Sequence, residues 1–289
     1  MAEFRINRTN DAVFKAVFAK HPKITLALIN AFFEFQGTEQ ITDIEFIDRE
    51  IDGDLPEDKE SRLDVLGRTA SGVKVDIEMQ VNELKEMGER SLFYWARNYV
   101  SLKKGEEYDS LRRTVCINIL AFNLLDERKY PKMHSCFGVY DKETGCQLTS
   151  QLEIHFLELK KFQSKSVKEM NRMERWAAYF SPVTPEEEIA ELAAEDEDIR
   201  AAVEVEKMFT QDEVARRKYE LAEKFRRDQA AQIRFARDEG LQQGRQDGKD
   251  EERLNSIRNL VKNLQITPPQ AMDALGIPAG EQGKYTSLL

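Results

Sequence analysis

The sequence has few cysteines and no long apolar run. Three cysteines in 289 residues are too few, and odd in number, for a disulfide scaffold, so they favour reduced thiols in the cytoplasm. No segment approaches the roughly 18 consecutive apolar residues of a membrane-spanning helix. The N-terminal residues also lack the apolar run of a signal peptide. We therefore expect a cytoplasmic protein without a membrane segment.

A surplus of positive charge is also missing. The formal net charge is -10, whereas a nucleic-acid-binding domain usually carries a basic patch. The excess of negative charge is local, because residues 181–213 contain twelve acidic residues and only two basic ones, Arg200 and Lys207. The rest of the chain is therefore balanced in charge, and its basic clusters leave DNA binding open.

Residues 62–81 predict a β-hairpin. From Val73 to Val81 the odd positions are apolar and the even positions are polar, which is the pattern of a half-buried strand. A three-residue turn at 70–72, in which Gly72 can take a positive φ, pairs residues whose numbers sum to 142. A slip of one residue would set apolar side chains against polar ones, so this register is favoured.

This register places two acids opposite each other. Asp64 faces Glu78 with Cβ atoms about 5 Å apart, and Gln80 follows on the same face. Opposed carboxylates repel unless a cation lies between them, and their oxygens suit Mg²⁺, which binds one or two carboxylates and keeps positions for water and phosphate. The alternative is an acid-rich strand facing water. Asp76, on the same face, is then either a neighbour of the metal ligands or simply solvated.

The hairpin belongs to a wider pattern, in which a helix precedes three strands and a second helix and a fourth strand follow. The motifs that carry it are Asn10-Asp11, Phe14-Lys15, Phe18, Leu63-Asp64-Val65, residues 75–80, Arg90, residues 94–97 and the glycine-punctuated residues 239–248. This pattern resembles the PD-(D/E)XK nuclease superfamily. More narrowly, it is similar to the Rpn family of recombination-promoting nucleases, also called PD-(D/E)XK family transposases, over most of the chain.

The resemblance implies an α/β fold: a restriction-endonuclease-like mixed sheet flanked by helices, followed by an all-helical C-terminal region. It also implies a metal-dependent DNA endonuclease linked to recombination or mobile elements. Asp64 and Glu78 would hold the cation, Mg²⁺ by preference and Mn²⁺ or Ca²⁺ otherwise. Gln80 stands where the superfamily usually has lysine. Glutamine can position water through hydrogen bonds, but it supplies no positive charge and no base.

A second function therefore stays open: a catalytically weak DNA- or protein-binding module that retains the nuclease fold. Gln80 and the acidic balance favour this module. The paired acids favour the nuclease, because opposed carboxylates carry an electrostatic cost that a binding module has no reason to keep.

Two further groups are candidates for supporting roles. Asp11 and Lys15 lie one helical turn apart and are either an auxiliary part of the site or a plain surface pair. Arg90, Tyr94 and Arg97 share one face of a helix expected over residues 84–102. They either guide DNA by charge and stacking or form a packed tyrosine flanked by arginine stems. No helix-turn-helix or zinc finger is evident, so little base-specific recognition of DNA is expected.

Strands are also expected at residues 114–122, 133–140 and 151–158. His134, Cys136, Cys146 and His155 lie in or beside them and raise the question of zinc. Their spacings match no ordinary zinc module, so the preferred interpretation is buried or edge-strand residues.

The 289 residues allow one large domain with an appendage. We expect a nuclease core over 1–168, a helical extension with the acidic segment and a long helix over 169–250, and a small helical tail over 251–289. Gly240, Gly244 and Gly248 recur every fourth residue in the long helix, and each costs about 1 kcal/mol of helix propensity. They indicate a close partner or deliberate flexibility. A homo-oligomer formed through the C-terminal helices is the favoured interpretation over a flexible linker.

Overall fold

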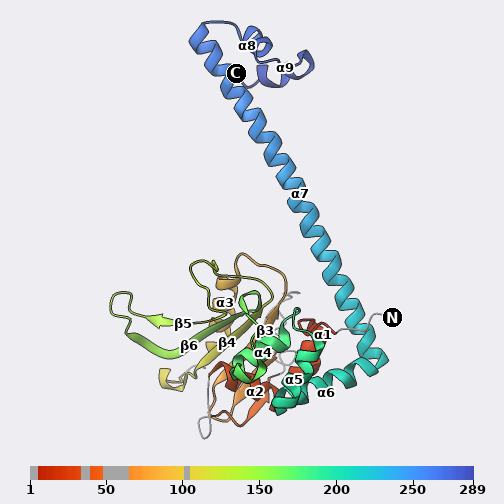
Figure 1. Ribbon diagram of the computed structural model, residues 1–289. Coiled ribbons are helices and arrows are strands. Elements are labelled where there is room, and N and C mark those ends of the chain that lie inside the picture. Colours follow the sequence, from red (N-terminus) through yellow and green to blue (C-terminus); the bar gives the residue numbers. More distant parts are fainter. Residues whose placement is uncertain (1–5, 34–39, 48–64, 101–104) are drawn as a thin grey trace. The chain divides into compact units, whose positions relative to one another are not determined.

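The computed structural model describes residues 6–33, 40–47, 65–100 and 105–289 (Figure 1). The chain divides into two compact units, Met1–Lys224 and Phe225–Leu289. No helix in these described ranges is long and apolar enough to cross a membrane.

Six described strands in the first unit form one mixed sheet in the order β1-β2-β3-β4-β6-β5. They are β1 (Ile44–Phe46), β2 (Val65–Thr69), β3 (Lys74–Gln80), β4 (Thr114–Leu120), β5 (His134–Tyr140) and β6 (Gln147–Glu158). The β3–β4 and β4–β6 pairs are parallel and the others are antiparallel. Parallel neighbours need a crossover connection, and helix α3 (Met87–Tyr99) lies between β3 and β4 in the chain. The predicted mixed α/β sheet is confirmed.

The remaining helices of the first unit precede and follow the sheet in the chain. They are α1 (Asp11–Phe18), α2 (Pro22–Phe32), α4 (Arg172–Phe180), α5 (Glu186–Glu195), α6 (Glu197–Gln211) and the first part of α7 (Glu213–Leu264). The Asn10 side chain accepts a hydrogen bond from the Ala12 amide and caps α1. Pro22 opens α2, where its missing N–H costs nothing. The chain therefore leaves α1 at Phe18 and starts a new helix at Pro22.

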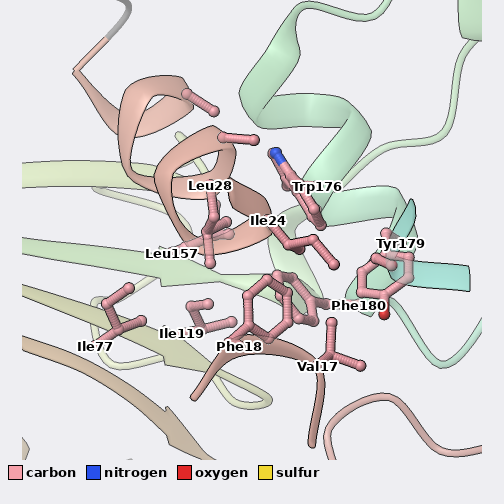
Figure 2. Packing of buried hydrophobic residues seen from close by; sticks show 14 of the residues in the cluster. Val17, Phe18, Ile24, Leu28, Ile77, Ile119, Leu157, Trp176, Tyr179 and Phe180 are labelled. Carbon is pink, nitrogen blue, oxygen red and sulfur yellow. The ribbon is translucent and has the colours of Figure 1, made fainter. Parts of the chain in front are cut away.

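The main core lies between one face of the sheet and helices α1, α2 and α4 (Figure 2). Ile77 and Ile119 contribute from the sheet, and Phe18, Trp176 and Phe180 from the helices. The Phe18 ring lies 5.7 Å from Trp176 and 5.6 Å from Phe180, centroid to centroid. Because α4, α5 and α6 all contribute to this core, the expected boundary at residue 168 falls inside the first unit. A smaller cluster, which includes Met87 of α3, covers the other face of the sheet.

The hairpin register follows the prediction. Val65 pairs with Ile77, Leu66 with Asp76 and Gly67 with Val75, so each pair sums to 142. Gly72 has φ 85° in the turn, a conformation that glycine adopts without strain.

The alternative of an acid-rich strand facing water is wrong for Asp76 and Glu78. Asp76 is 2% exposed and Glu78 is 7% exposed. Strand β3 is an interior strand of the sheet, and α3 packs against the face that carries these two acids. The alternation in sequence identified the two faces, but it carried no information on whether a helix would cover the polar one.

The second unit contains the later part of α7 together with α8 (Pro268–Ala274) and α9 (Ala279–Thr286). The long helix continues past the expected boundary at residue 250 to Leu264, and α8 and α9 form the rest of the helical tail. The buried residues of this unit are Ile257, Ala271, Met272, Ile277 and Tyr285. The Tyr285 hydroxyl donates to Asp250 at 2.6 Å. Hydrogen bonds from Lys284 and Tyr285 lower the pKa of Asp250 to about 2.

Candidate active site

The side chains of β3 divide between the two faces of the sheet. Val75, Ile77 and Met79 enter the main core, so the side chains of Asp76 and Glu78 point to the opposite face, against α3. Asp64, the expected partner of Glu78, lies outside the described residues. The measured register fits the predicted pairing of these two acids, which stays a prediction.

Asp76 is held by a group of buried hydrogen-bond donors. Asn98 of α3 donates from Nδ2 to its Oδ2 at 3.2 Å, and Cys116 of β4 places its Sγ 3.8 Å from the same oxygen. Lys74 donates from Nζ to the Asn98 carbonyl at 2.6 Å. Burial, together with the neighbouring charge of Arg68, lowers the pKa of Lys74. The interpretation of Asp76 as a solvated acid is therefore wrong, and its carboxylate ties β3 to α3.

Glu78 lies beside an arginine and an asparagine. Arg90 Nε is 3.9 Å from Glu78 Oε2, and the parallel register sets Glu78 opposite Asn118 of β4. Asn118 Oδ1 accepts from Ser91 Oγ at 3.1 Å, while Asn118 Nδ2 donates to the His155 carbonyl at 3.1 Å. Glu78 thus presents its carboxylate on a buried but polar part of the sheet.

Two of the residues around these acids, Asn98 and Asn118, were not singled out from the sequence. Asn118 is an amide within an apolar strand. A polar residue inside an apolar strand is a usable signal, because buried polar groups need hydrogen-bond partners. Asn98 gives a weaker signal, since it is one of several polar residues on α3.

Gln80 ends β3 and is half-buried. Its Nε2 donates to the Asn82 carbonyl at 3.1 Å, in the loop that follows the strand. It lies two residues beyond Glu78 on the same face of β3, as predicted, and its role stays a prediction.

The Arg90, Tyr94 and Arg97 face is only partly open to solvent. Tyr94 is 5% exposed, and the Arg90 guanidinium lies 5.0 Å from the centre of its ring. Arg97 is exposed. This is the packed-tyrosine alternative, so a base has no open Tyr94 ring on which to stack. A contact of Arg97 with DNA stays a prediction.

Asp11 and Lys15 form an ion pair of 2.7 Å on the exposed side of α1. This geometry is the plain surface pair, which typically contributes about 0.3–0.5 kcal/mol to stability. The auxiliary role of Asp11 and Lys15 stays a prediction.

The residues described at this site fit a hard divalent cation. Mg²⁺ prefers carboxylate and amide oxygens, and Glu78 offers a carboxylate beside Asn118, on the strand face that the polar residues share. A second carboxylate one strand away completes the minimal donor set if the predicted pairing of Asp64 holds. The chemistry of the donor set therefore agrees with the expected metal.

The comparisons with known proteins agree with this arrangement. A family model described as PD-(D/E)XK nuclease family transposase matches residues 8–236. No curated protein and no solved structure matches the chain. The matched range covers the whole sheet, α3 and the candidate site. The chain therefore belongs to the PD-(D/E)XK nuclease family transposases.

Proposed function

We propose that this protein is a metal-dependent deoxyribonuclease that hydrolyses phosphodiester bonds of DNA during recombination or the movement of mobile elements. The observation that supports this most is Glu78 and Gln80 on β3, in a hairpin whose register predicts Asp64 opposite Glu78. The family match over residues 8–236 agrees with a nuclease of this class.

In the proposed mechanism, Asp64 and Glu78 would hold Mg²⁺, with Mn²⁺ or Ca²⁺ as alternatives. A divalent cation bound there supplies polarisation of the phosphate and a lower pKa for water. Gln80 accepts a hydrogen bond from the attacking water through its amide oxygen and so orients it. Asp76, fixed by Asn98, keeps β3 in place against α3.

DNA binding in this proposal depends on phosphate contacts. Arg97 is exposed on α3, and Arg90 lies half-buried beside Glu78. Contacts of this kind carry little base sequence information, and they weaken as salt rises because bound counterions are released. We therefore expect DNA cleavage with little sequence specificity.

Plasmid DNA incubated with the purified full chain is expected to be nicked with Mg²⁺ or Mn²⁺ and to stay intact in EDTA. Ca²⁺ is tested beside them. Asp64→Ala is expected to abolish nicking because a metal ligand is lost. Glu83→Ala removes an exposed acid just after β3 and serves as the matched control, with an unchanged rate. Gel separation of supercoiled, nicked and linear plasmid measures all of these reactions.

The alternative binding module makes a different prediction for the same reactions. Gln80 in place of lysine favours it, because the site then lacks a cationic side chain at that position. No cutting with any ion, together with equal DNA binding by wild type and Asp64→Ala, would support the binding module and contradict the nuclease.

We also propose that the protein self-associates through its C-terminal helices. Large apolar side chains on α7 are exposed, among them Phe225 at 63% and Phe235 at 70%. A Cβ added at Gly240, Gly244 or Gly248 would meet no atom within 4 Å, so a partner helix has room to approach. Light scattering is expected to give a mass above the 33.5 kDa of one chain, and Gly244→Leu is expected to lower it. A monomeric wild type would contradict this proposal.

A further inference from the structure

Four side chains capable of metal binding lie together on strands β5 and β6. They are His134, Cys136, Glu153 and His155. The antiparallel register pairs Cys136 with His155, and Glu153 follows on the same face of β6. His155 packs its ring against Phe32 at 5.9 Å, so this cluster faces α2. The prediction of buried or edge-strand residues is confirmed for His155, which is buried, and for His134 and Cys136 on edge strand β5. It is wrong for Cys146, which is exposed in the turn before β6.

The cluster is separate from the candidate nuclease site. Asp76 and Glu78 point toward α3, whereas His155 points toward α2 on the other side of the sheet. The inference that follows therefore does not rest on the proposed nuclease function.

The ligand atoms are spaced as a metal ion requires. Cys136 Sγ lies 3.7 Å from His155 Nε2, and His155 Nε2 lies 3.4 Å from Glu153 Oε2. All three atoms lie within 4.8 Å of one another. In a tetrahedral zinc site, with bonds of about 2.3 Å to sulfur and 2.0–2.1 Å to nitrogen, ligand atoms are about 3.3–3.6 Å apart. Small side-chain adjustments would therefore let one ion contact all three.

The contact on the far side of His155 is compatible with the tautomer that metal binding requires. His155 Nδ1 lies 3.0 Å from His134 Nε2, and the two rings are stacked. A proton on His155 Nδ1 donates to His134 and leaves the Nε2 lone pair facing Cys136 and Glu153. Metal-binding histidines are commonly oriented by such a bond to the other ring nitrogen. Arg113 donates to Glu153 Oε2 at 2.6 Å and holds that carboxylate in place, although its charge also competes with a cation.

We propose that Cys136, Glu153 and His155 form a zinc-binding site, with water as the fourth ligand. A thiolate and an imidazole select zinc and similar transition metals over Mg²⁺. Cys136 is exposed, which gives the ion a path of entry, and its thiol proton passes to solvent when the sulfur binds the metal. The bound ion links edge strand β5 to β6 and so stabilises the outer edge of the sheet.

Cobalt is the probe that tests this site. The reduced full chain, titrated with Co²⁺ in excess Mg²⁺, is expected to develop the thiolate-to-cobalt charge-transfer band at one equivalent, and Zn²⁺ is expected to remove it. Cys136→Ser should abolish the band and weaken Zn²⁺ binding, measured by competition with a chelating dye, by at least about 100-fold. Cys146→Ser is the matched control, because Cys146 is also exposed and lies outside the cluster. It should bind like wild type.

Two results would overturn the proposal. One is the absence of a thiolate band in a folded wild type at micromolar metal. The other is Zn²⁺ binding that Cys136→Ser leaves unchanged. Binding at the candidate nuclease site is told apart by Cys136→Ser, because Cys136 belongs to the cluster on β5 and β6 and not to that site. Failure of DNA cleavage would likewise leave the zinc measurement unaffected.

Discussion

Replacing Arg8 with methionine is expected to lower the free energy of unfolding of the first unit by about 3–5 kcal/mol. Arg8 Nε donates to Glu206 Oε1 at 3.0 Å, and its two Nη atoms donate to the Glu186 carboxylate at 3.0 Å each. The Arg8 and Glu206 side chains are only 5% and 4% exposed. Methionine would leave the Glu206 carboxylate buried without its cation. Urea unfolding followed by the fluorescence of Trp176, which lies in the same core, measures the loss.

The loss should depend on pH in a defined direction. Burial raises the pKa of Glu206, and the Arg8 charge partly opposes this rise. Without Arg8, the pKa of Glu206 in the folded state rises further above its value in the unfolded state. As pH falls, Glu206 therefore takes up a proton in the folded state before it does so in the unfolded state, and this uptake stabilises the fold. The loss in free energy of unfolding caused by Arg8→Met should therefore be smaller at pH 5 than at pH 8.

A surface arginine provides the control for Arg8. Arg216 pairs with Glu220 at 3.5 Å, and both side chains are more than half exposed. Arg216→Met should change stability by no more than about 0.5 kcal/mol. Adding Glu206→Gln to Arg8→Met should recover part of the loss, because it removes the unpaired charge. A cost for Arg8→Met as small as that for Arg216→Met would contradict the buried-pair argument.

This cluster shows why the acidic segment was only partly interpretable from sequence. Residues 181–213 read as an excess of negative charge, yet Glu206 lies inside the fold and its Oε1 accepts from the Tyr179 hydroxyl as well as from Arg8. Arg8 is 198 residues away from Glu206 in the chain. A charge count along the sequence has no access to partners at that distance, so the role of these acids emerges only from the fold.

The hairpin shows the opposite case, because its determinants are local. The turn at Gly72 and the alternation in β3 fix the register within twenty residues, and the observed pairs agree with it. The burial of Asp76 and Glu78 was missed because it depends on α3, which follows β3 in the chain and docks on it. For Tyr94 the sequence left two alternatives open for the same reason, since a helix sequence does not state which of two adjacent faces packs, and the structure shows the packed one.

The sequence pointed to Cys136 and His155 as metal-binding candidates, but their approach to Glu153 could not be predicted, for a geometric reason. Zinc modules recognisable from sequence place ligands in short, regular spacings. Here Cys136 and His155 meet across an antiparallel pair, and the third ligand candidate, Glu153, is an ordinary acid in a strand. Only the register of β5 against β6 brings the three together.

Replacing Glu78 with glutamine is expected to slow DNA cleavage by about 100- to 1,000-fold. Loss of a metal ligand removes several kcal/mol of transition-state stabilisation, and each 1.36 kcal/mol is a factor of about ten. Glutamine has nearly the same size and keeps an oxygen beside Arg90, which lies 3.9 Å from the native carboxylate. The fold should therefore survive. The single-turnover rate of plasmid nicking at saturating Mg²⁺ measures the effect.

Asp76→Asn separates the role of Glu78 from that of its neighbour. Asp76 lies two residues away on the same strand and accepts a hydrogen bond from Asn98. Losing the Asp76 charge should therefore weaken the attachment of β3 to α3. This lowers the stability of the fold but not the affinity for the metal. Mg²⁺ should raise the melting temperature of wild type and of Asp76→Asn, because a ligand that binds only the folded state stabilises it. Mg²⁺ should leave the melting temperature of Glu78→Gln unchanged, because this variant has lost a metal ligand. If Glu78→Gln kept both this response and the cleavage rate, Glu78 would not be a metal ligand.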